Sequence, residues 1–145
     1  MRQLILDLLP ASPPTLDNFV AGGNGETVAA LTGWLAGTPG DTSFCLWGKA
    51  GSGCWHLLLA SGFAYADAAL DPTLASAPES EQLAVDHVDR LDDTGQVALF
   101  NRFNRLKMGC GQLLTAAGQP PAHLELREDL RTRLGSGLIY RLQPL

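Results

Sequence analysis

FCLWGKAGSGCWH, residues 44–56, joins a short apolar run to a glycine-rich turn. The turn fits the frame G-x-x-x-x-G-K-[ST], with Gly48 as its first glycine and Gly53 as its second. In a phosphate-binding loop of this form, the glycines turn backbone N–H groups toward phosphate between a buried strand and a helix. The stretch therefore predicts a strand, a loop and a helix in that order, in a fold of the nucleotide-binding type.

The two side chains that give such a loop its chemistry are missing. The lysine position of the frame holds Cys54, and the hydroxyl position holds Trp55. A neutral thiol cannot hold a terminal phosphate as an ammonium does, and an indole donates one N–H and cannot ligate magnesium. Lys49 lies five positions before the missing lysine and is not expected to replace it. We therefore expect the fold of an NTPase without most of its chemistry, and not an enzyme.

Size and composition narrow the class of protein further. A chain of 145 residues is expected to form one domain. Its 46% hydrophobic and 17% charged residues are typical of a globular protein, and the apolar run Leu57–Ala60 is too short to cross a bilayer. A net charge of −5 argues against a protein that works by neutralising DNA phosphates. We expect neither membrane association nor direct DNA binding.

The cysteines and the N-terminus indicate a cytoplasmic protein without a metal site. Cys45, Cys54 and Cys110 are spaced like neither a zinc site nor a redox pair, so they are expected to be small hydrophobes. Asp7 stands where a signal peptide would carry its apolar stretch, which argues against secretion.

Apolar runs and helical periodicities alternate along the chain. Strands are predicted at residues 44–47, 62–66, 82–86, 112–116 and 138–142. Helices are predicted at residues 26–35, 94–106 and 127–134, with Asn24 as the N-cap of the first, and a further helix is predicted to follow the glycine loop and run through Leu57 to about residue 61. Strands that alternate with helices form a parallel sheet covered on both faces. Residues 10–145 are therefore expected to form an α/β domain of three layers, α/β/α, around five parallel strands.

Residues 1–9 are expected to form a separate N-terminal arm. QLILDL, residues 3–8, is apolar and extended in character, and Pro10, Pro13 and Pro14 follow it as a short stiff linker. An extended apolar peptide suits docking on a partner. An edge strand on the domain's own sheet is the alternative.

An acidic residue ends the third predicted strand. In parallel-sheet NTPases an acid at the carboxyl end of the strand beside the phosphate loop holds magnesium, and Asp86 stands at that position. His87 follows it, where ATPases of this kind usually carry a second acid. The alternative is that Asp86 caps a turn together with Asp89.

Four further stretches carry a resemblance to a known family. They are TLDNFV at 15–20, LAVDHVDRL at 83–91, LLTAAGQPP at 113–121 and LRTRLGSGLIYRLQPL at 130–145. With the loop at 44–56, they resemble the AAA+ domain of the DnaA family of bacterial replication initiators, and more closely its regulatory relatives of the Hda type. The resemblance covers nearly the whole chain and implies a P-loop NTPase (AAA+) core. Family members continue into a C-terminal helical lid, which this sequence lacks.

The resemblance also implies a set of nucleotide-binding positions. Phe19 and Val20 would border the adenine pocket, and residues 116–118 stand where the family's sensor strand carries polar side chains, which are absent here. The implied positions are Gly48, Gly51, Ser52, Gly53, Cys54, Trp55, Asp86, Phe19 and Val20. Because the glycines leave a nest of N–H groups, the expected cofactor is none or weakly bound ADP.

Two partner-directed features follow from the same resemblance. Arg133 corresponds to the family's arginine finger, which stabilises charge on a nucleotide held by a neighbouring subunit. From spacing alone, an arginine at a helix end that pairs with Glu128 or Asp129 is favoured instead. The arm resembles the Q-L-x-L-x-L peptide that grips the sliding clamp, with its contacts from Gln3, Leu4, Leu6 and Leu8.

Together these features predict an Hda-like regulator of replication initiation. The chain would dock on the sliding clamp, lie at the nucleoid through its partners, and supply Arg133 to stimulate ATP hydrolysis by DnaA. A DnaA-like ATPase that binds ATP itself and a catalytically inert clamp-binding module are the alternatives. Whether the chain forms a homo-oligomer is left open.

Overall fold

The strands of the described residues form one parallel sheet of five, in the order β2-β3-β4-β1-β5. The computed structural model describes residues 24–36, 40–49 and 53–143. The strand bounds are β1 Ser43–Trp47, β2 Ala64–Asp67, β3 Gln82–Asp86, β4 Gln112–Ala117 and β5 Leu138–Arg141. β1 pairs with both β4 and β5, so the first predicted strand lies inside the sheet, next to the edge strand β5. The prediction of five parallel strands is confirmed.

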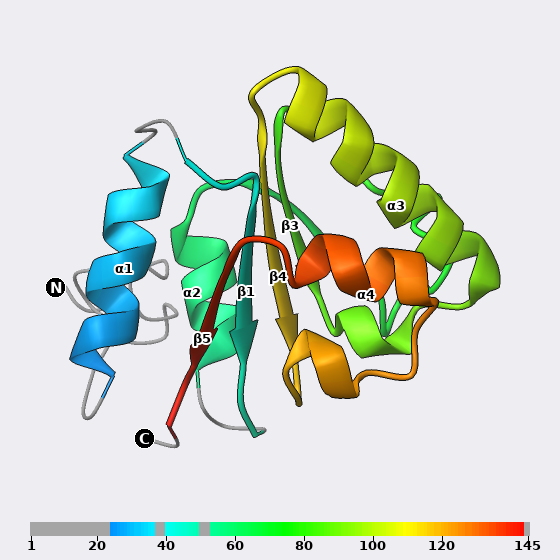
Figure 1. Ribbon diagram of the computed structural model, residues 1–145. Helices are drawn as coiled ribbons and strands as arrows, with labels where there is room; N and C mark the ends of the chain where they lie inside the picture. The colour runs from blue at the N-terminus through cyan, green and yellow to red at the C-terminus, as the bar shows by residue number, and fades with distance from the viewer. Residues whose placement is uncertain (1–23, 37–39, 50–52, 144–145) are drawn as a thin grey trace, which may run out of the picture.

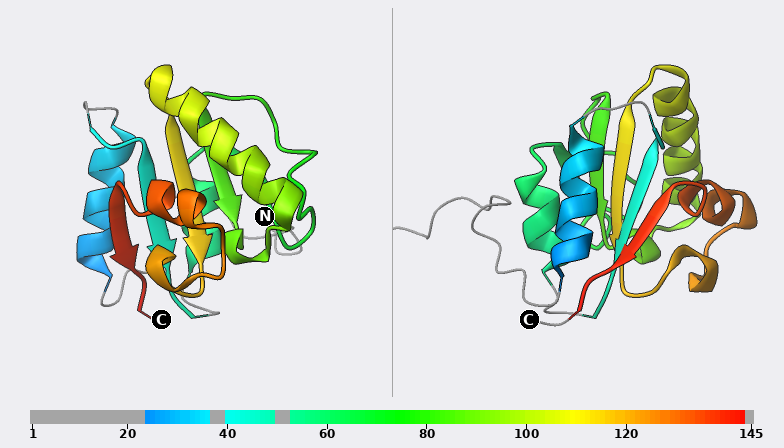
Figure 2. Two further views of the ribbon diagram at one scale, coloured as in Figure 1. Left: turned by 45° about the vertical axis from the view of Figure 1, so that its right-hand side comes forward. Right: turned by 60° about the vertical axis from the view of Figure 1, so that its left-hand side comes forward.

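Helices cover both faces of this sheet (Figure 1). Their bounds are α1 Gly25–Leu35, α2 Cys54–Ala60, α3 Asp93–Met108 and α4 Glu128–Leu134, with short 3-10 turns η1 Val88–Arg90 and η2 Pro121–His123. α1 and α2 lie on one face and α3 and α4 on the other, as the views of Figure 2 also show. The three-layer α/β/α architecture is therefore confirmed.

Two separate apolar cores lie on the two sides of the sheet. On one side Leu31 of α1 and Leu57 of α2 are fully buried against Phe44 of β1. On the other side Leu99 of α3 and Leu130 of α4 are fully buried in a second cluster. Alternate residues of one strand point to opposite faces, so β3 and β4 each contribute residues to both cores.

The Asn24 side chain at the start of α1 has a different role from the one the sequence predicted. Asn24 occupies the N-cap position of α1, but its side chain makes no capping hydrogen bond. Instead its Nδ2 donates to the main-chain oxygen of Gln143 at 3.1 Å, and its Oδ1 accepts from the Gln143 N–H at 2.7 Å. The prediction of Asn24 as a side-chain cap was wrong, because the amide fits a pair of main-chain groups beside β5.

Element ends differ from prediction by a few residues at most. β2 begins at Ala64 rather than at residue 62 and continues to Asp67. Phe63 is buried in the α1–α2 core without belonging to a strand, which explains why its apolar character was misleading. Among the helices of the described residues, none combines the length and the apolar composition that a bilayer crossing requires.

Candidate functional site

A hollow of about 730 Å³ lies where α2 begins, at the carboxyl ends of β1, β3 and β4. This is the end at which the strand arrows of Figure 1 point, and it is where parallel-sheet proteins bind ligands. The walls of the hollow are formed by Gly48, Lys49, Gly53, Cys54, Trp55, His56, Asp86, His87, Asp89, Arg90, Ala116, Ala117 and Gly118. The fold therefore brings the described part of the predicted loop, the strand-end acid and the sensor-strand positions together.

The start of α2 has the backbone of a phosphate loop without its side chains. Gly53 is the N-cap residue and adopts a left-handed conformation with φ 100°, which favours glycine. Cys54 is the first residue of the helix and packs partly against the α1–α2 core. Trp55 is 56% exposed, so its indole points largely into solvent. Neither position supplies an ammonium or a hydroxyl to the hollow.

Two cations line the hollow at positions other than that of the loop lysine. Lys49 is exposed in the segment after β1, and Arg90 is exposed at the end of η1. The sequence interpretation gave Lys49 no role and did not single out Arg90. The sequence could have indicated Arg90, because it lies four residues after the strand-end acid and therefore close to the same edge of the sheet. The hollow thus keeps some positive charge, although not at the helix N-terminus.

Asp86 ends β3 as predicted, and its carboxylate is already engaged. The residue is 4% exposed. Its Oδ2 accepts from the Tyr65 hydroxyl at 3.0 Å, and its Oδ1 accepts from the His87 backbone N–H at 2.8 Å. Partial burial and the neighbouring Asp86 charge raise the pKa of Tyr65 well above its usual value, which keeps the phenol protonated as a donor. The bond to His87 is a local turn contact, as in the capping alternative, but no bond between Asp86 and Asp89 is found in the described residues.

His87 connects the ends of two neighbouring strands. Its Nδ1 lies 2.8 Å from Oδ1 of Asp67, the last residue of β2, and 3.7 Å from Oδ1 of Asp86. Burial opposes the charged ring, but the Asp67 hydrogen bond and the charges of Asp86, Asp67 and Asp89 together raise the pKa of His87. The sequence interpretation missed Asp67, which lies 20 residues before His87. Asp67 could have been found in the sequence, because it is an acid that directly follows the strand predicted at residues 62–66.

The sensor-strand positions are apolar in the structure as well. Ala116 and Ala117 end β4, are buried, and line the hollow together with Gly118. Their side chains end at Cβ or are absent, so they offer no donor to a phosphate. This agrees with the expectation drawn from the sequence for residues 116–118.

Arg133 is separate from the hollow. It lies in the last turn of α4, and the central carbon of its guanidinium, Cζ, lies over the Phe100 ring of α3 at 5.3 Å from the ring centroid. Asp129, one of its two predicted alternative partners, pairs with Arg127 at 3.4 Å instead. Arg133 is half-buried and is not among the residues that line the hollow. The fold therefore does not bring the predicted finger to the chain's own phosphate loop.

Several predicted site residues lie outside the described residues. These are the arm residues Gln3, Leu4, Leu6 and Leu8, the adenine-pocket residues Phe19 and Val20, and Gly51 and Ser52 of the loop. The division into an arm at 1–9 and a core at 10–145 falls in the same region and stays a prediction.

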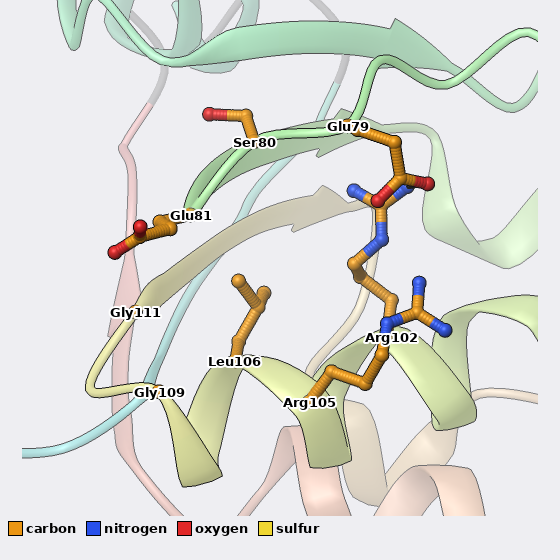
Figure 3. A pocket seen from close by; sticks show the side chains of 8 residues that line it. All are labelled: Glu79, Ser80, Glu81, Arg102, Arg105, Leu106, Gly109 and Gly111. Atoms are coloured by element: carbon orange, nitrogen blue, oxygen red, sulfur yellow. Dashed lines mark hydrogen bonds and ion pairs between the residues drawn. The ribbon is translucent and has the colours of Figure 1, made fainter.

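A smaller cavity of about 260 Å³ lies between the start of β3 and the C-terminal part of α3 (Figure 3). Arg102, buried on α3, donates to the Pro78 carbonyl at 2.9 Å and lies 3.2 Å from the Glu79 carboxylate. In Figure 3 its guanidinium reaches up to Glu79, while Glu81 points away from it. No predicted functional residue lines this cavity, and the buried arginine fastens the segment before β3 to α3.

The fold is that of the AAA+ domain of DnaA. Domain III of DnaA from Thermotoga maritima aligns with 94% of the chain and 70% of its own length, at 24% identity and a TM-score of 0.76. AMPPCP-bound DnaA from Aquifex aeolicus aligns with 91% of the chain, at 24% identity and a TM-score of 0.76. The chain spans 50% of that DnaA structure. These likenesses confirm the predicted fold, which is that of a P-loop NTPase (AAA+) core.

A more similar sequence is found in Neisseria meningitidis. The solution structure of protein NMB1076 is 40% identical, with 71% of the chain and 76% of that protein aligned and a TM-score of 0.58. No model of a known protein family matches the sequence. The chain belongs to the same family as NMB1076.

The donor set at the hollow does not fit a magnesium triphosphate of the kind a P-loop holds. The lysine and hydroxyl positions carry Cys54 and Trp55, so neither an ammonium nor a hydroxyl stands at the start of α2. A magnesium-bound triphosphate needs a lysine ammonium for its outer phosphates and a serine or threonine hydroxyl for its metal.

Proposed function

We propose that the chain is an Hda-like regulator of DNA replication initiation, which supplies Arg133 to a nucleotide held by DnaA. One observation carries the proposal. A DnaA-type fold keeps an arginine on a rigid helix, outside its own hollow, while Cys54 and Trp55 replace the catalytic side chains of its loop. A regulator that acts on a partner's nucleotide needs such an arginine. It does not need the lysine and the hydroxyl residue of a catalytic loop.

The hollow supports a protein that is not itself an ATPase. Without an ammonium at position 54 and a hydroxyl at position 55, charge developing on a transferred phosphoryl group lacks its usual stabilisation. Lys49 and Arg90, which line the hollow together with the acids Asp86 and Asp89, are the groups that would attract the phosphates of a weakly bound ADP. Bound ADP would then be a structural ligand, and no cofactor is required.

The surroundings of Arg133 suit a finger that acts in trans. α4 is anchored by Leu130 and Leu134, both fully buried, so the helix presents the arginine from a fixed base. Among the described residues the contact of the guanidinium is with the Phe100 ring, and no hydrogen bond from its N–H groups is found there, so its donors are left for a nucleotide. No ion pair of Arg133 is found in the described residues, so none of their carboxylates neutralises it.

The proposed partners are the sliding clamp and DnaA. Residues 3–8 would dock on the clamp, with the Gln3 amide at the rim of a pocket and Leu6 and Leu8 in an apolar cleft. The clamp would bring the chain to DNA, so that no direct DNA contact is needed. In this proposal the protein acts in the cytoplasm at the nucleoid, and it can do so as a monomer or as a homo-oligomer.

The test is ATP hydrolysis by DnaA in the presence of clamp loaded on DNA and the full chain. Arg133→Ala should reduce the stimulation by roughly 10³ to 10⁵, the range of arginine fingers. Arg127→Ala is the matched control, because Arg127 lies beside the same helix but pairs with Asp129 at the surface. It should leave the stimulation unchanged.

The two alternatives give different results in the same assay. If Arg133→Ala leaves the stimulation intact while Gln3→Ala abolishes clamp binding, the chain is an inert clamp-binding module. If the chain alone hydrolyses ATP, it is a DnaA-like ATPase and the reading of Cys54 and Trp55 is wrong.

A further inference from the structure

Three metal-ligating side chains meet at the ends of β2 and β3. They are Asp67, Asp86 and His87, and one ligand atom from each lies within 4.8 Å of the other two. We propose that this triad binds a divalent transition-metal ion, Zn²⁺ or an ion of similar preference, through one imidazole nitrogen and two carboxylate oxygens. The site is independent of the proposed action of Arg133.

The distances between the ligand atoms fit a small ion. Zn²⁺ binds imidazole nitrogen and carboxylate oxygen at about 2.0–2.2 Å, so two ligand atoms on one tetrahedral ion are roughly 3.3–3.5 Å apart. Nδ1 of His87 lies 2.8 Å from Oδ1 of Asp67 and 3.7 Å from Oδ1 of Asp86. These values lie on either side of the tetrahedral spacing, so the triad can close on an ion by shifts of about half an ångström.

Groups outside the triad hold its carboxylates in place. The Tyr65 hydroxyl donates to Oδ2 of Asp86 at 3.0 Å, and the His87 backbone N–H donates at 2.8 Å to Oδ1, the oxygen that lies 3.7 Å from the His87 Nδ1. The Ala69 N–H donates to Oδ1 of Asp67 at 2.9 Å. Hydrogen bonds of this kind orient the carboxylate ligands of metal sites and contribute to affinity. The two strand ends are themselves fixed, because Asp67 and Asp86 are direct partners in the pairing of β2 with β3.

The position of the triad leaves a place for a further ligand. Asp86 and His87 belong to the wall of the 730 Å³ hollow, and the His87 side chain is 50% exposed. An ion held by three protein ligands and open to a cavity keeps its fourth position for water or an anion. No cation is paired with Asp67 or Asp86 in the described residues other than the imidazole itself. A divalent ion would compensate two carboxylates, one of which is buried.

The imidazole determines which metal is expected. Magnesium prefers oxygen ligands in an octahedral arrangement, whereas a nitrogen ligand with two carboxylates favours zinc and its neighbours. A strand-end acid alone would indicate magnesium, but His87 and Asp67 change the donor set. The sequence expectation of no metal site rested on spacing along the chain, which does not reveal that β2 and β3 are neighbours.

The test is titration of the metal-free full chain with Co²⁺, followed by absorption and calorimetry. We expect one ion per chain, visible ligand-field bands, and no thiolate-to-cobalt charge-transfer band, because the ligands are nitrogen and oxygen. Asn tolerates the left-handed backbone of His87 at φ 51° but offers no imidazole nitrogen, so His87→Asn removes the ligand without straining the turn. It should weaken binding by about tenfold or more.

The controls separate the triad from other donors. His123→Asn alters an exposed histidine of η2 that does not belong to the triad and should leave the affinity unchanged. Asp67→Asn should weaken binding as His87→Asn does. A charge-transfer band, equal affinity of His87→Asn and the native chain, or loss of binding only in His56→Asn would each overturn the assignment.

Discussion

Replacing Asn24 tests how the first helix is held to the sheet. Its side-chain amide makes two hydrogen bonds to the main chain of Gln143, at 3.1 and 2.7 Å, and the residue is 2% exposed. Hydrogen bonds of this kind contribute about 1 kcal/mol each to stability. Asn24→Ala removes both, so the free energy of unfolding should fall by about 2 kcal/mol.

The serine variant distinguishes this bridge from a helix cap. Serine is as good an N-cap residue as asparagine, but its side chain is too short to make both contacts. If Asn24 acted as a cap, Asn24→Ser would be nearly neutral. Because the amide instead spans to Gln143, we expect Asn24→Ser to lose about as much stability as Asn24→Ala, roughly 2 kcal/mol.

The assay is urea unfolding followed by circular dichroism, with the free energy taken from linear extrapolation. Gln143→Ala is the matched control, because Asn24 contacts only the main chain of Gln143 and that variant should be neutral. An Asn24→Ser chain within about 0.5 kcal/mol of the native protein would refute the bridge as the source of stability.

Three further changes have defined outcomes. A Cβ at Gly95 would overlap the Pro72 carbonyl, so Gly95→Ala should lower the free energy of unfolding by about 3 kcal/mol in the same urea assay. In native thiol labelling Cys110, which is exposed, should react first; burial raises the pKa of Cys45 to about 11, so Cys45 should react only on unfolding. Cys54→Lys restores the loop cation and should raise the affinity for a fluorescent ADP by about tenfold, because a charge-assisted hydrogen bond is gained. An unchanged affinity would contradict the explanation that the missing ammonium weakens phosphate binding.

The sequence predicted the sheet well because its central strands are apolar on both faces. β3 was expected at residues 82–86 and is found at Gln82–Asp86, since a short buried run bounded by polar residues has few other structures open to it. β2 was placed less well. Phe63 packs in the α1–α2 core just before that strand, and composition does not separate burial in a loop from burial in a strand.

The candidate site was predicted only where it follows the chain. Strand-end positions such as Asp86 and the loop at Cys54 can be found from local pattern. The contact of Asp67 with His87 depends on which strands are neighbours. The hydrogen bonds of Asn24 to Gln143 depend on the position of the C-terminal strand relative to α1. Both are consequences of strand order, which no local pattern encodes.

The hollow and Arg133 lie on helices that pack in different cores, which bears on how the proposed function can be tested. The loop helix α2 buries Leu57 and Leu58 in the core shared with α1, whereas α4 buries Leu130 and Leu134 in the core on the other side of the sheet. Changes at sites without shared partners are generally additive in free energy. A variant of Cys54 should therefore alter nucleotide affinity without moving Arg133. If such a variant also changed the stimulation of a partner's ATP hydrolysis, the effect would have to pass through bound nucleotide, and the chain's own hollow would belong to the mechanism after all.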